Sequence, residues 1–275
     1  MLLSTLKDKA REQGLPLQTV AVEALHIILL DALFSQSESQ GMAFQGGTAT
    51  HLLHGGYRYS EDLDFAGAEL TSNNAMLLVQ KSQQAVEKNV MQILGSGSAS
   101  WKTPEPKSST RVYTSWFHFH PAGEPLTLRV KLEFAQFPVY NPEPFVVRSD
   151  LDVLQRTPLI NGLPPAELLA EKIAAVAGRR YIKGRDLFDL WYLTEILKMD
   201  FDTELTTRKF RDYNVRTDLT ARLQLLREFS DAALTQEMNR FLPQRYRRMI
   251  EKDGFQKIHQ QAVAVVEKAF AELKQ

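Results

Sequence analysis

The chain has 275 residues, of which 44% are hydrophobic and 24% are charged, as in ordinary soluble globular proteins. This composition excludes a disordered tail protein, a collagen and a disulfide scaffold. Lys and Arg total 33, and Asp and Glu also total 33, so the formal net charge is zero. Zero net charge excludes a uniformly cationic coat for nucleic acid, although it allows a local basic patch. Cysteine is absent, which excludes disulfides and thiolate metal sites.

Neither a membrane span nor a secretion signal is expected. The longest apolar stretch, residues 20–34, is interrupted by Glu23, His26 and Asp31, and we interpret it as too short and too charged to cross a bilayer. The N-terminus lacks a basic segment followed by an apolar core and a small-residue cleavage site. We therefore expect a cytoplasmic protein that does not associate with membranes.

Helical and strand patterns alternate in the first part of the chain. Apolar residues at helical spacing predict helices over residues 4–13, 16–34 and 73–94. Short apolar or alternating segments predict strands over residues 42–45 and 62–65. Gly46 and Gly47 are expected to end the first of these strands. Thr48 is expected to cap a short helix that ends at Gly55 and Gly56.

The middle of the chain is rich in strand patterns. Residues 95–110 are rich in Gly, Ser, Pro and Lys and are expected to form a loop. Alternating segments at residues 111–120 and 126–134 flank a Pro- and Gly-containing turn, which predicts a β-hairpin. Residues 145–148 are expected to add one more short strand.

Helical periodicity dominates from Pro164 onward, and no strand is predicted there. We therefore expect an α/β (α+β) protein with a mixed sheet and flanking helices in residues 1–160, followed by an all-helical lobe in residues 161–275. Residues 160–275 carry 20 basic and 17 acidic side chains, so this part has a net charge of 20 − 17 = +3. The rest has (33 − 20) − (33 − 17) = −3. The basic residues cluster at 172–185, 208–216 and 240–248, which is typical of solvated helix faces and also of phosphate-binding surfaces.

Two aspartates carry the strongest chemical signal. Asp62 and Asp64 are separated by one residue, so on a strand both project from one face, about 7 Å apart. Such a pair attracts a hard divalent cation such as Mg²⁺, which prefers oxygen ligands. Glu133 is the one carboxylate on the polar face of the predicted strand 126–134, and we nominate it as a third member of a two-metal site.

The segment Gly46-Gly47-Thr48 has features of an anion site. Two glycines allow the backbone to approach a ligand closely, and the start of the following helix presents N–H groups and a positive dipole end. A threonine hydroxyl can add a hydrogen bond to a phosphate. An ordinary tight turn between strand and helix would have the same sequence, and no Walker motif is present.

These stretches resemble the AbiEii/AbiGii nucleotidyltransferase toxin family, which is part of the DNA polymerase β-like nucleotidyltransferase superfamily. The resemblance rests on Gly46-Gly-Thr48, on Arg58-Tyr-Ser-Glu-Asp-Leu-Asp-Phe65 and on a second block, Glu171-Lys-Ile-Ala-Ala175 with Lys183-Gly-Arg-Asp-Leu-Phe-Asp-Leu190. Together with Glu133, these motifs cover roughly residues 44–190. A glutamate at position 133 is a departure, because aspartate is commoner at the third acidic position.

The resemblance implies a nucleotidyltransferase that uses an NTP and two Mg²⁺ ions. It implies that Asp62 and Asp64 bind the metal ions, with Glu133 as a further ligand or a base. The implied nucleotide-binding residues are Gly46, Gly47, Thr48, Lys172, Lys183 and Arg185. Asp186 joins Lys172 and Arg185 in the implied catalytic set.

The residues of the second block support this interpretation independently. Lys172 lies on a helix predicted from Pro165, and no acidic residue occurs between Lys172 and Asp186. Such a basic cluster can stabilise the charge of a departing pyrophosphate. Asp186 and Asp189 share a helix face. Asp186 is expected either to cap its helix or to orient Arg185 or Lys183.

Histidines and aromatic residues allow weaker alternatives. The pairs His51 with His54 and His118 with His120 could each chelate a metal ion, although no third ligand accompanies them and packing is the favoured interpretation. Tyr57 and Tyr59 could stack on a base or pack within their loop.

By resemblance, the acceptor is expected to be RNA, with a tRNA 3′ end favoured, and the protein a type IV toxin with a role in phage defence. A separately encoded antitoxin would oppose it. Two alternatives stay open: transfer to a hydroxyl of a protein or small molecule, and a non-catalytic nucleotide-binding regulator that acts through a partner.

Overall fold

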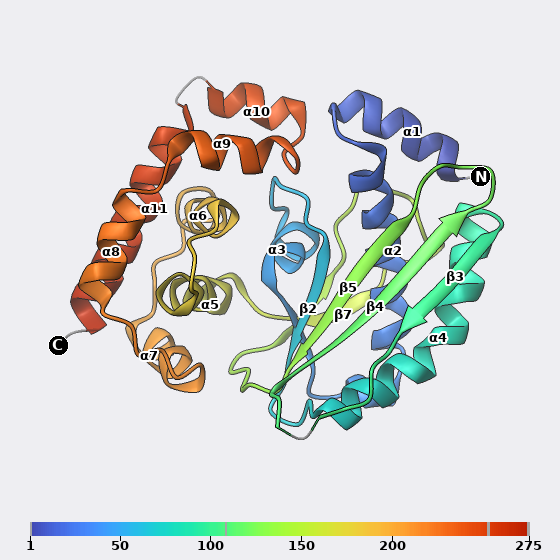
Figure 1. The fold of residues 1–275 in the computed structure, drawn as a ribbon, viewed down its shortest axis with the longest axis horizontal. Coiled ribbons are helices and arrows are strands. Elements are labelled where there is room, and N and C mark those ends of the chain that lie inside the picture. Colours follow the sequence, from blue (N-terminus) through green and yellow to red (C-terminus); the bar gives the residue numbers. More distant parts are fainter. Residues whose placement is uncertain (1, 108, 252–253, 274–275) are drawn as a thin grey trace. The chain divides into compact units, whose positions relative to one another are not determined.

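The computed structural model describes residues 2–107, 109–251 and 254–273. Residue 108 of the expected loop and residues 252–253 and 274–275 of the expected helical lobe lie outside this description. The chain forms two compact units (Figure 1). The first comprises residues 1–55 and 59–163, and the second comprises residues 56–58 and 164–275.

A seven-stranded mixed sheet forms the centre of the first unit. In spatial order its strands are β3 (Gly97–Lys102), β4 (Val112–Pro121), β5 (Leu128–Ala135), β2 (Asp62–Ala66), β1 (Ala43–Gln45), β7 (Leu159–Gly162) and β6 (Glu143–Val146). β2 pairs in parallel with β5, β1 pairs in parallel with β7, and the other neighbours are antiparallel. The acidic strand β2 therefore lies in the interior of the sheet.

Helices flank this sheet. The first unit contains α1 (Leu2–Gln13), α2 (Leu17–Phe34), a 3₁₀ turn (Ser37–Ser39), α3 (Gly46–His54) and α4 (Ser72–Leu94). α2 and α4 pack together and against the strands (Figure 1). Apolar residues of α2 share one core with Leu63, Phe65 and Phe134. The buried face of β2 and β5 is thereby committed to packing, and their polar residues lie on the opposite face.

The interpretation of the apolar stretch as too short and too charged to cross a bilayer is wrong on those criteria: the helix extends from Leu17 to Phe34 and, by length and composition alone, is long and apolar enough to cross a membrane. In this structure it is a core helix instead, because most of its residues, including Glu23 and His26, are buried within the first unit.

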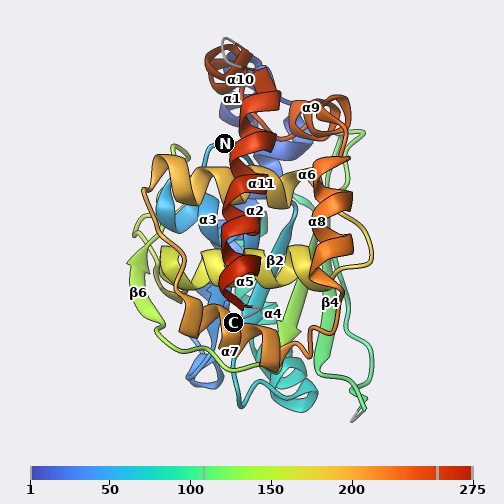
Figure 2. The same cartoon turned by 90° about the vertical axis from the view of Figure 1, so that its left-hand side faces the viewer.

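The described residues of the second unit form helices and the loops between them, with no strand. It contains α5 (Pro165–Gly178), α6 (Gly184–Trp191), a π-helical turn (Tyr192–Ile196), α7 (Thr203–Asp212), α8 (Leu219–Arg227), α9 (Asp231–Asn239), α10 (Gln244–Glu251) and α11 (Gly254–Leu273). α11 runs across α6 and contacts it (Figure 2). A second apolar core, which includes Phe188, Trp191 and Leu234, holds these helices together. The predicted mixed sheet with a helical second part is confirmed.

Two strands contradict the sequence-based expectations. Residues 97–102 lie in the expected loop but form β3, which pairs with β4 along its length. Residues 159–162 span the expected boundary between the two parts, where no strand is predicted, but they form β7. β3 consists mostly of small and polar residues, and β7 has only four residues. Both are stabilised by pairing with a neighbouring strand, which local sequence patterns do not report.

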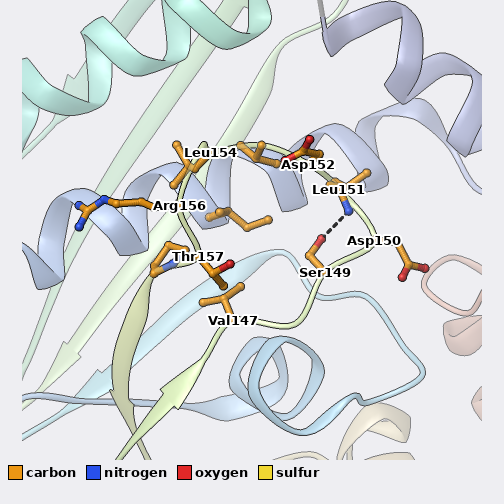
Figure 3. Close-up of a pocket in the computed structure, with 11 residues that line it drawn as sticks. Val147, Ser149, Asp150, Leu151, Asp152, Leu154, Arg156 and Thr157 are labelled. Atoms are coloured by element: carbon orange, nitrogen blue, oxygen red, sulfur yellow. Dashed lines mark hydrogen bonds between the residues drawn. The ribbon is translucent and has the colours of Figure 1, made fainter.

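A cavity of about 250 Å³ lies in the first unit beside Ile27 of α2, beneath the segment 147–158 (Figure 3). Arg156 extends from one end of this segment and Asp150 from the other, while the Ser149 hydroxyl accepts a hydrogen bond from the amide of Leu151. None of the predicted site residues lines this cavity.

A buried histidine anchors the start of β2. His26 is 1% exposed, and its Nε2 donates a hydrogen bond to the carbonyl of Glu61, 3.1 Å away. Burial lowers the pKa of His26 to about 4, although the hydrogen bond to Glu61 opposes this shift. The neutral ring therefore holds the backbone immediately before Asp62.

We predict that the first unit gains stability as pH rises from 4 to 6.5. In this window the unfolded chain protonates His26 and the folded chain does not, so folding is weakened at the acidic end by about 3 kcal/mol. Urea unfolding at pH 5, 6 and 7 measures the slope, and His26→Gln, which keeps an N–H donor, should reduce it. His120→Gln, on an exposed histidine, is the matched control. An unchanged slope in His26→Gln would contradict the prediction.

Candidate active site

The acidic pair lies on the polar face of β2. Leu63 and Phe65 are fully buried, whereas Asp62 and Asp64 are partly exposed. This alternation places both carboxylates on one face, as the sequence predicts. The interior position of β2, between β1 and β5, holds the pair on a backbone that is hydrogen-bonded on both sides.

Gly46 forms a close-fitting cradle for Asp64. Its φ angle is +80°, in the left-handed region that favours glycine. A Cβ at this position would collide with Oδ2 of Asp64 and would lie 3.1 Å from its Cγ. The first glycine of the Gly-Gly-Thr segment is therefore required both by its backbone conformation and by the carboxylate that it contacts.

Thr48 does not cap α3. The helix begins at Gly46, and Gln45 stands at the N-cap, three residues earlier than the expected cap. Thr48 is 1% exposed, and its hydroxyl donates a hydrogen bond to the backbone carbonyl of Asp62. A hydroxyl has one proton to donate, so in this structure Thr48 fixes the helix to the acidic strand instead of offering that proton to a phosphate.

Glu133 lies beside Asp64 in the parallel register of β2 and β5. Its carboxylate is paired with Lys131, at 2.6 Å. Within residues 2–107, 109–251 and 254–273, no three Asp, Glu or His side chains converge closely enough to hold a metal ion. The structure thus brings Glu133 next to the acidic pair, but it gives that carboxylate a lysine partner.

Gln45 is a residue of this site that sequence reasoning missed. It pairs with Asp64 across β1 and β2, so an amide, Asp64 and Glu133 form one row over three adjacent strands. Its Oε1 is buried and accepts no hydrogen bond from any described residue. An unsatisfied oxygen beside a carboxylate suits a hard cation. Only the strand register places Gln45 there, since nothing distinguishes it in the sequence.

Lys172 is the centre of a buried ionic cluster in the second unit. It lies on α5, is 7% exposed and contacts two carboxylates of α6: Asp186 at 3.0 Å and Asp189 at 2.7 Å. Asp186 also pairs with Arg179. Both acids belong to one face of α6, as their spacing predicts. Asp186 therefore does not cap α6, because its carboxylate is directed to Lys172 and Arg179. That it orients Arg185 or Lys183 stays a prediction.

Mutual pairing keeps this cluster ionised. Burial alone would raise the pKa values of Asp186 and Asp189, but the neighbouring cations outweigh burial and hold both values below the usual range. Burial would likewise lower the pKa of Lys172, and the two aspartates raise it instead. The second-block lysine is thus charged, rigidly held and largely enclosed.

Arg185 is not part of this ionic cluster. Its Nε lies 3.4 Å from Glu237 on α9, and the same glutamate accepts a 2.7 Å hydrogen bond from the backbone amide of Gly184. Lys183 is the residue that precedes α6. Glu237 therefore fixes the first turn of α6, directly after Lys183.

The tyrosines and histidines pack rather than form a second site. Tyr57 stacks on Tyr246, with ring centroids 4.1 Å apart, and the Tyr59 hydroxyl donates to Gln13. His51 contacts Glu23 at 2.8 Å, and His54 Nε2 donates to the carbonyl of Leu163.

We predict that Gly46→Ala displaces the Asp64 carboxylate. Gly41 provides a matched control, since its φ of +78° is similar but nothing lies within 4 Å of an added Cβ. Both changes should cost about 1 kcal/mol in backbone strain, and Gly46→Ala should cost a further 1–3 kcal/mol, roughly, for overpacking. Chemical unfolding and Mn²⁺ titration of both variants test this, and equal behaviour of the two would contradict it.

We predict that Lys172→Met destabilises the second unit by about 3–5 kcal/mol, because it leaves two buried aspartates without one of their cations. Arg185→Met removes a longer, more accessible ion pair and should cost less than about 1 kcal/mol. Denaturant unfolding followed by circular dichroism compares the two variants. Equal losses would show that the buried lysine has no special role in folding.

Comparison with known proteins now identifies the family. The model of the family "Nucleotidyl transferase AbiEii toxin, Type IV TA system" matches residues 28–271. This range includes the Gly-Gly-Thr segment, β2, Glu133 and the whole ionic cluster. No curated protein matches the chain at a significant level.

Solved structures share the fold. A putative nucleotidyltransferase from Helicobacter pylori is 16% identical, with a TM-score of 0.54 over 94% of this chain and 98% of its own. The protein JHP933 from Helicobacter pylori is 17% identical, with a TM-score of 0.55 over 94% and 95%. The nucleotidyltransferase toxin MenT4 from Mycobacterium tuberculosis is 16% identical, with a TM-score of 0.54 over 97% and 99%. From the family match over most of its length, the chain belongs to the AbiEii nucleotidyltransferase toxins of type IV toxin–antitoxin systems.

Proposed function

We propose that this toxin transfers a nucleoside monophosphate from an NTP to an RNA acceptor, in a reaction that requires Mg²⁺. The observation that carries the proposal is the arrangement on β2: two carboxylates share the polar face, and Gly46, which has no Cβ, leaves room for the carboxylate of Asp64. An enzyme that catalyses nucleotidyl transfer needs rigidly held oxygen ligands for divalent cations, and the phosphate oxygens of the substrate bind the same cations.

The residues present suit a divalent cation. Asp62 and Asp64 would hold it. Gln45, whose Oε1 accepts no hydrogen bond from a described residue, is the partner of Asp64 in the adjacent strand. Glu133 would join only by exchanging its partner Lys131, or it would act as a base. When bound, Mg²⁺ would supply Lewis-acid polarisation of phosphate oxygens and lower the barrier to attack.

The chain's own groups would perform three tasks in the reaction. The start of α3 offers backbone N–H groups of residues 46–48 to phosphate oxygens. Lys172, Lys183 and Arg185 supply positive charge that would stabilise the departing pyrophosphate. An acceptor hydroxyl would attack the α-phosphorus in line, a new P–O bond would form, and the bond to pyrophosphate would break.

We favour RNA, with a tRNA 3′ end as the acceptor, because the helical part carries the net positive charge. Its exposed arginines include Arg240, Arg245 and Arg248 on and beside α10, and such groups bind phosphates in a salt-dependent way. We further propose a cytoplasmic toxin that a separately encoded antitoxin neutralises, with a role in phage defence. Membership of a type IV toxin family supports these roles.

We predict that Asp62→Asn and Asp64→Asn each reduce transfer by at least about 100-fold, because each removes one anionic ligand without changing the size of the side chain. Each of the four α-³²P-labelled NTPs is incubated with the protein, Mg²⁺ and total RNA, and label is sought in RNA, protein and small molecules. Asp150→Asn, on the loop 147–158, is the matched control.

Label in protein or in a small hydroxyl compound would replace the RNA acceptor. Absence of label from every fraction, together with toxicity in cells that persists in Asp64→Asn, would overturn the transferase proposal in favour of a binding mechanism.

A further inference from the structure

Arg58 belongs to the second unit although it precedes the acidic strand in sequence. The chain enters that unit for residues 56–58 only, between α3 and β2. Tyr57 and Arg58 are both tied to it: the first by stacking on Tyr246 and the second by its guanidinium. We therefore ask what the buried Arg58 contributes to the second unit.

Arg58 forms a bidentate ion pair with Asp189. Its Nε donates to Oδ1 and its Nη2 donates to Oδ2, each at 2.6 Å. Arg58 is 3% exposed, and the geometry is the paired arrangement that guanidinium and carboxylate groups favour. Oδ2 of Asp189 also contacts Lys172 at 2.7 Å. Arg58 and Lys172 thus share one carboxylate oxygen.

Counting the directly connected charges shows what Arg58 adds. Arg58, Lys172 and Arg179 contribute three positive charges, whereas Asp186 and Asp189 contribute two negative charges, so the cluster carries 3 − 2 = +1. Without Arg58 it would be neutral. Glu237 also acts electrostatically on Arg58, but its negative charge is matched by Arg185, with which it pairs. An excess charge in a mostly buried group attracts an anion more strongly than the same charge in water.

The cluster also has an opening to solvent. The Arg179 side chain is 42% exposed, while the Asp186 side chain that it contacts is 4% exposed. Positive charge that Arg58 contributes inside can therefore act on a phosphate that approaches from the side of Arg179.

We propose that Arg58 is a positioning residue: by occupying Asp189 it leaves Lys172 and Arg179 with the surplus positive charge that binds a triphosphate. This inference rests on the proposed nucleotidyl transfer. Arg58 need not touch the nucleotide, because it acts through the carboxylate that it shares with Lys172. In its absence, both aspartates would neutralise Lys172 and Arg179 completely.

Charge-balance variants separate this role from simple structural support. Arg58→Met removes the surplus charge and the ion pair together. Arg58→Met with Asp189→Asn also lacks the ion pair but has charges 2 − 1 = +1, as in the wild type. Asp189→Asn alone raises the cluster to +2. Arg156→Met, at an exposed arginine of the first unit, controls for the change in total charge.

Binding of inorganic triphosphate and of each of the four NTPs, with Mg²⁺, is measured by equilibrium dialysis on the full chain, and circular dichroism and thermal melting report folding. Arg58→Met should weaken binding by about 10- to 100-fold. The double variant should return to within about threefold of wild type, and Asp189→Asn should bind more tightly than wild type.

Folded Arg58→Met that binds as wild type does, or a folded double variant that binds no better than Arg58→Met, would overturn the proposal. If Arg58→Met fails to fold, the double variant and Asp189→Asn test the proposal instead. The proposal is contradicted if their affinities for triphosphate do not follow the net charge of the cluster. Wild-type protein that binds neither triphosphate nor any NTP would refute the transferase proposal as well. Wild-type protein that transfers label while the variants bind equally would refute the role of Arg58 alone.

Discussion

The rest of the structure depends on the division of β2 into one apolar and one acidic face. Leu63 and Phe65 are buried in the core with residues of α2, which fixes the direction of the intervening aspartates. Two anchors then hold the backbone at the start of the strand: His26 donates to the carbonyl of Glu61, and Thr48 donates to the carbonyl of Asp62. Burial of these apolar residues therefore offsets the repulsion between two aspartates that are held close together on one strand.

The second unit solves the opposite electrostatic problem. It encloses cations and carboxylates together, and each is kept ionised by its neighbours, so the aspartates have lowered pKa values and Lys172 has a raised one. Such a network is costly unless every member is paired. Arg58 completes the pairing of Asp189 from a segment distant in sequence from α5 and α6, and it raises the net charge of the cluster from zero to +1. In our proposal, the groups that stabilise this unit are also the groups that attract the triphosphate.

Family membership and geometry inform different parts of the functional picture. The match over residues 28–271 establishes a nucleotidyltransferase toxin, while the fold neighbours, at 16–17% identity, share its architecture. The structure adds residue-level departures from the simplest expectation. Thr48 anchors a backbone instead of offering its proton to a ligand, and Glu133 is paired with a lysine. Gln45 carries an oxygen that accepts no hydrogen bond from the part of the chain that the structure describes.

Much of this protein is determined by the sequence alone. Periodicity places α2, α4, β2 and the β4–β5 hairpin, because side chains that alternate between core and solvent leave a local pattern. The spacing of Asp62 and Asp64 suffices to place both on one face. Other features were decided only by tertiary structure. They are strands β3 and β7, the contact between Gly46 and Asp64, the row that includes Gln45, and the sharing of Asp189 by Arg58 and Lys172. Each joins segments far apart in the chain, so its energy comes from pairing, register and burial that no local window contains.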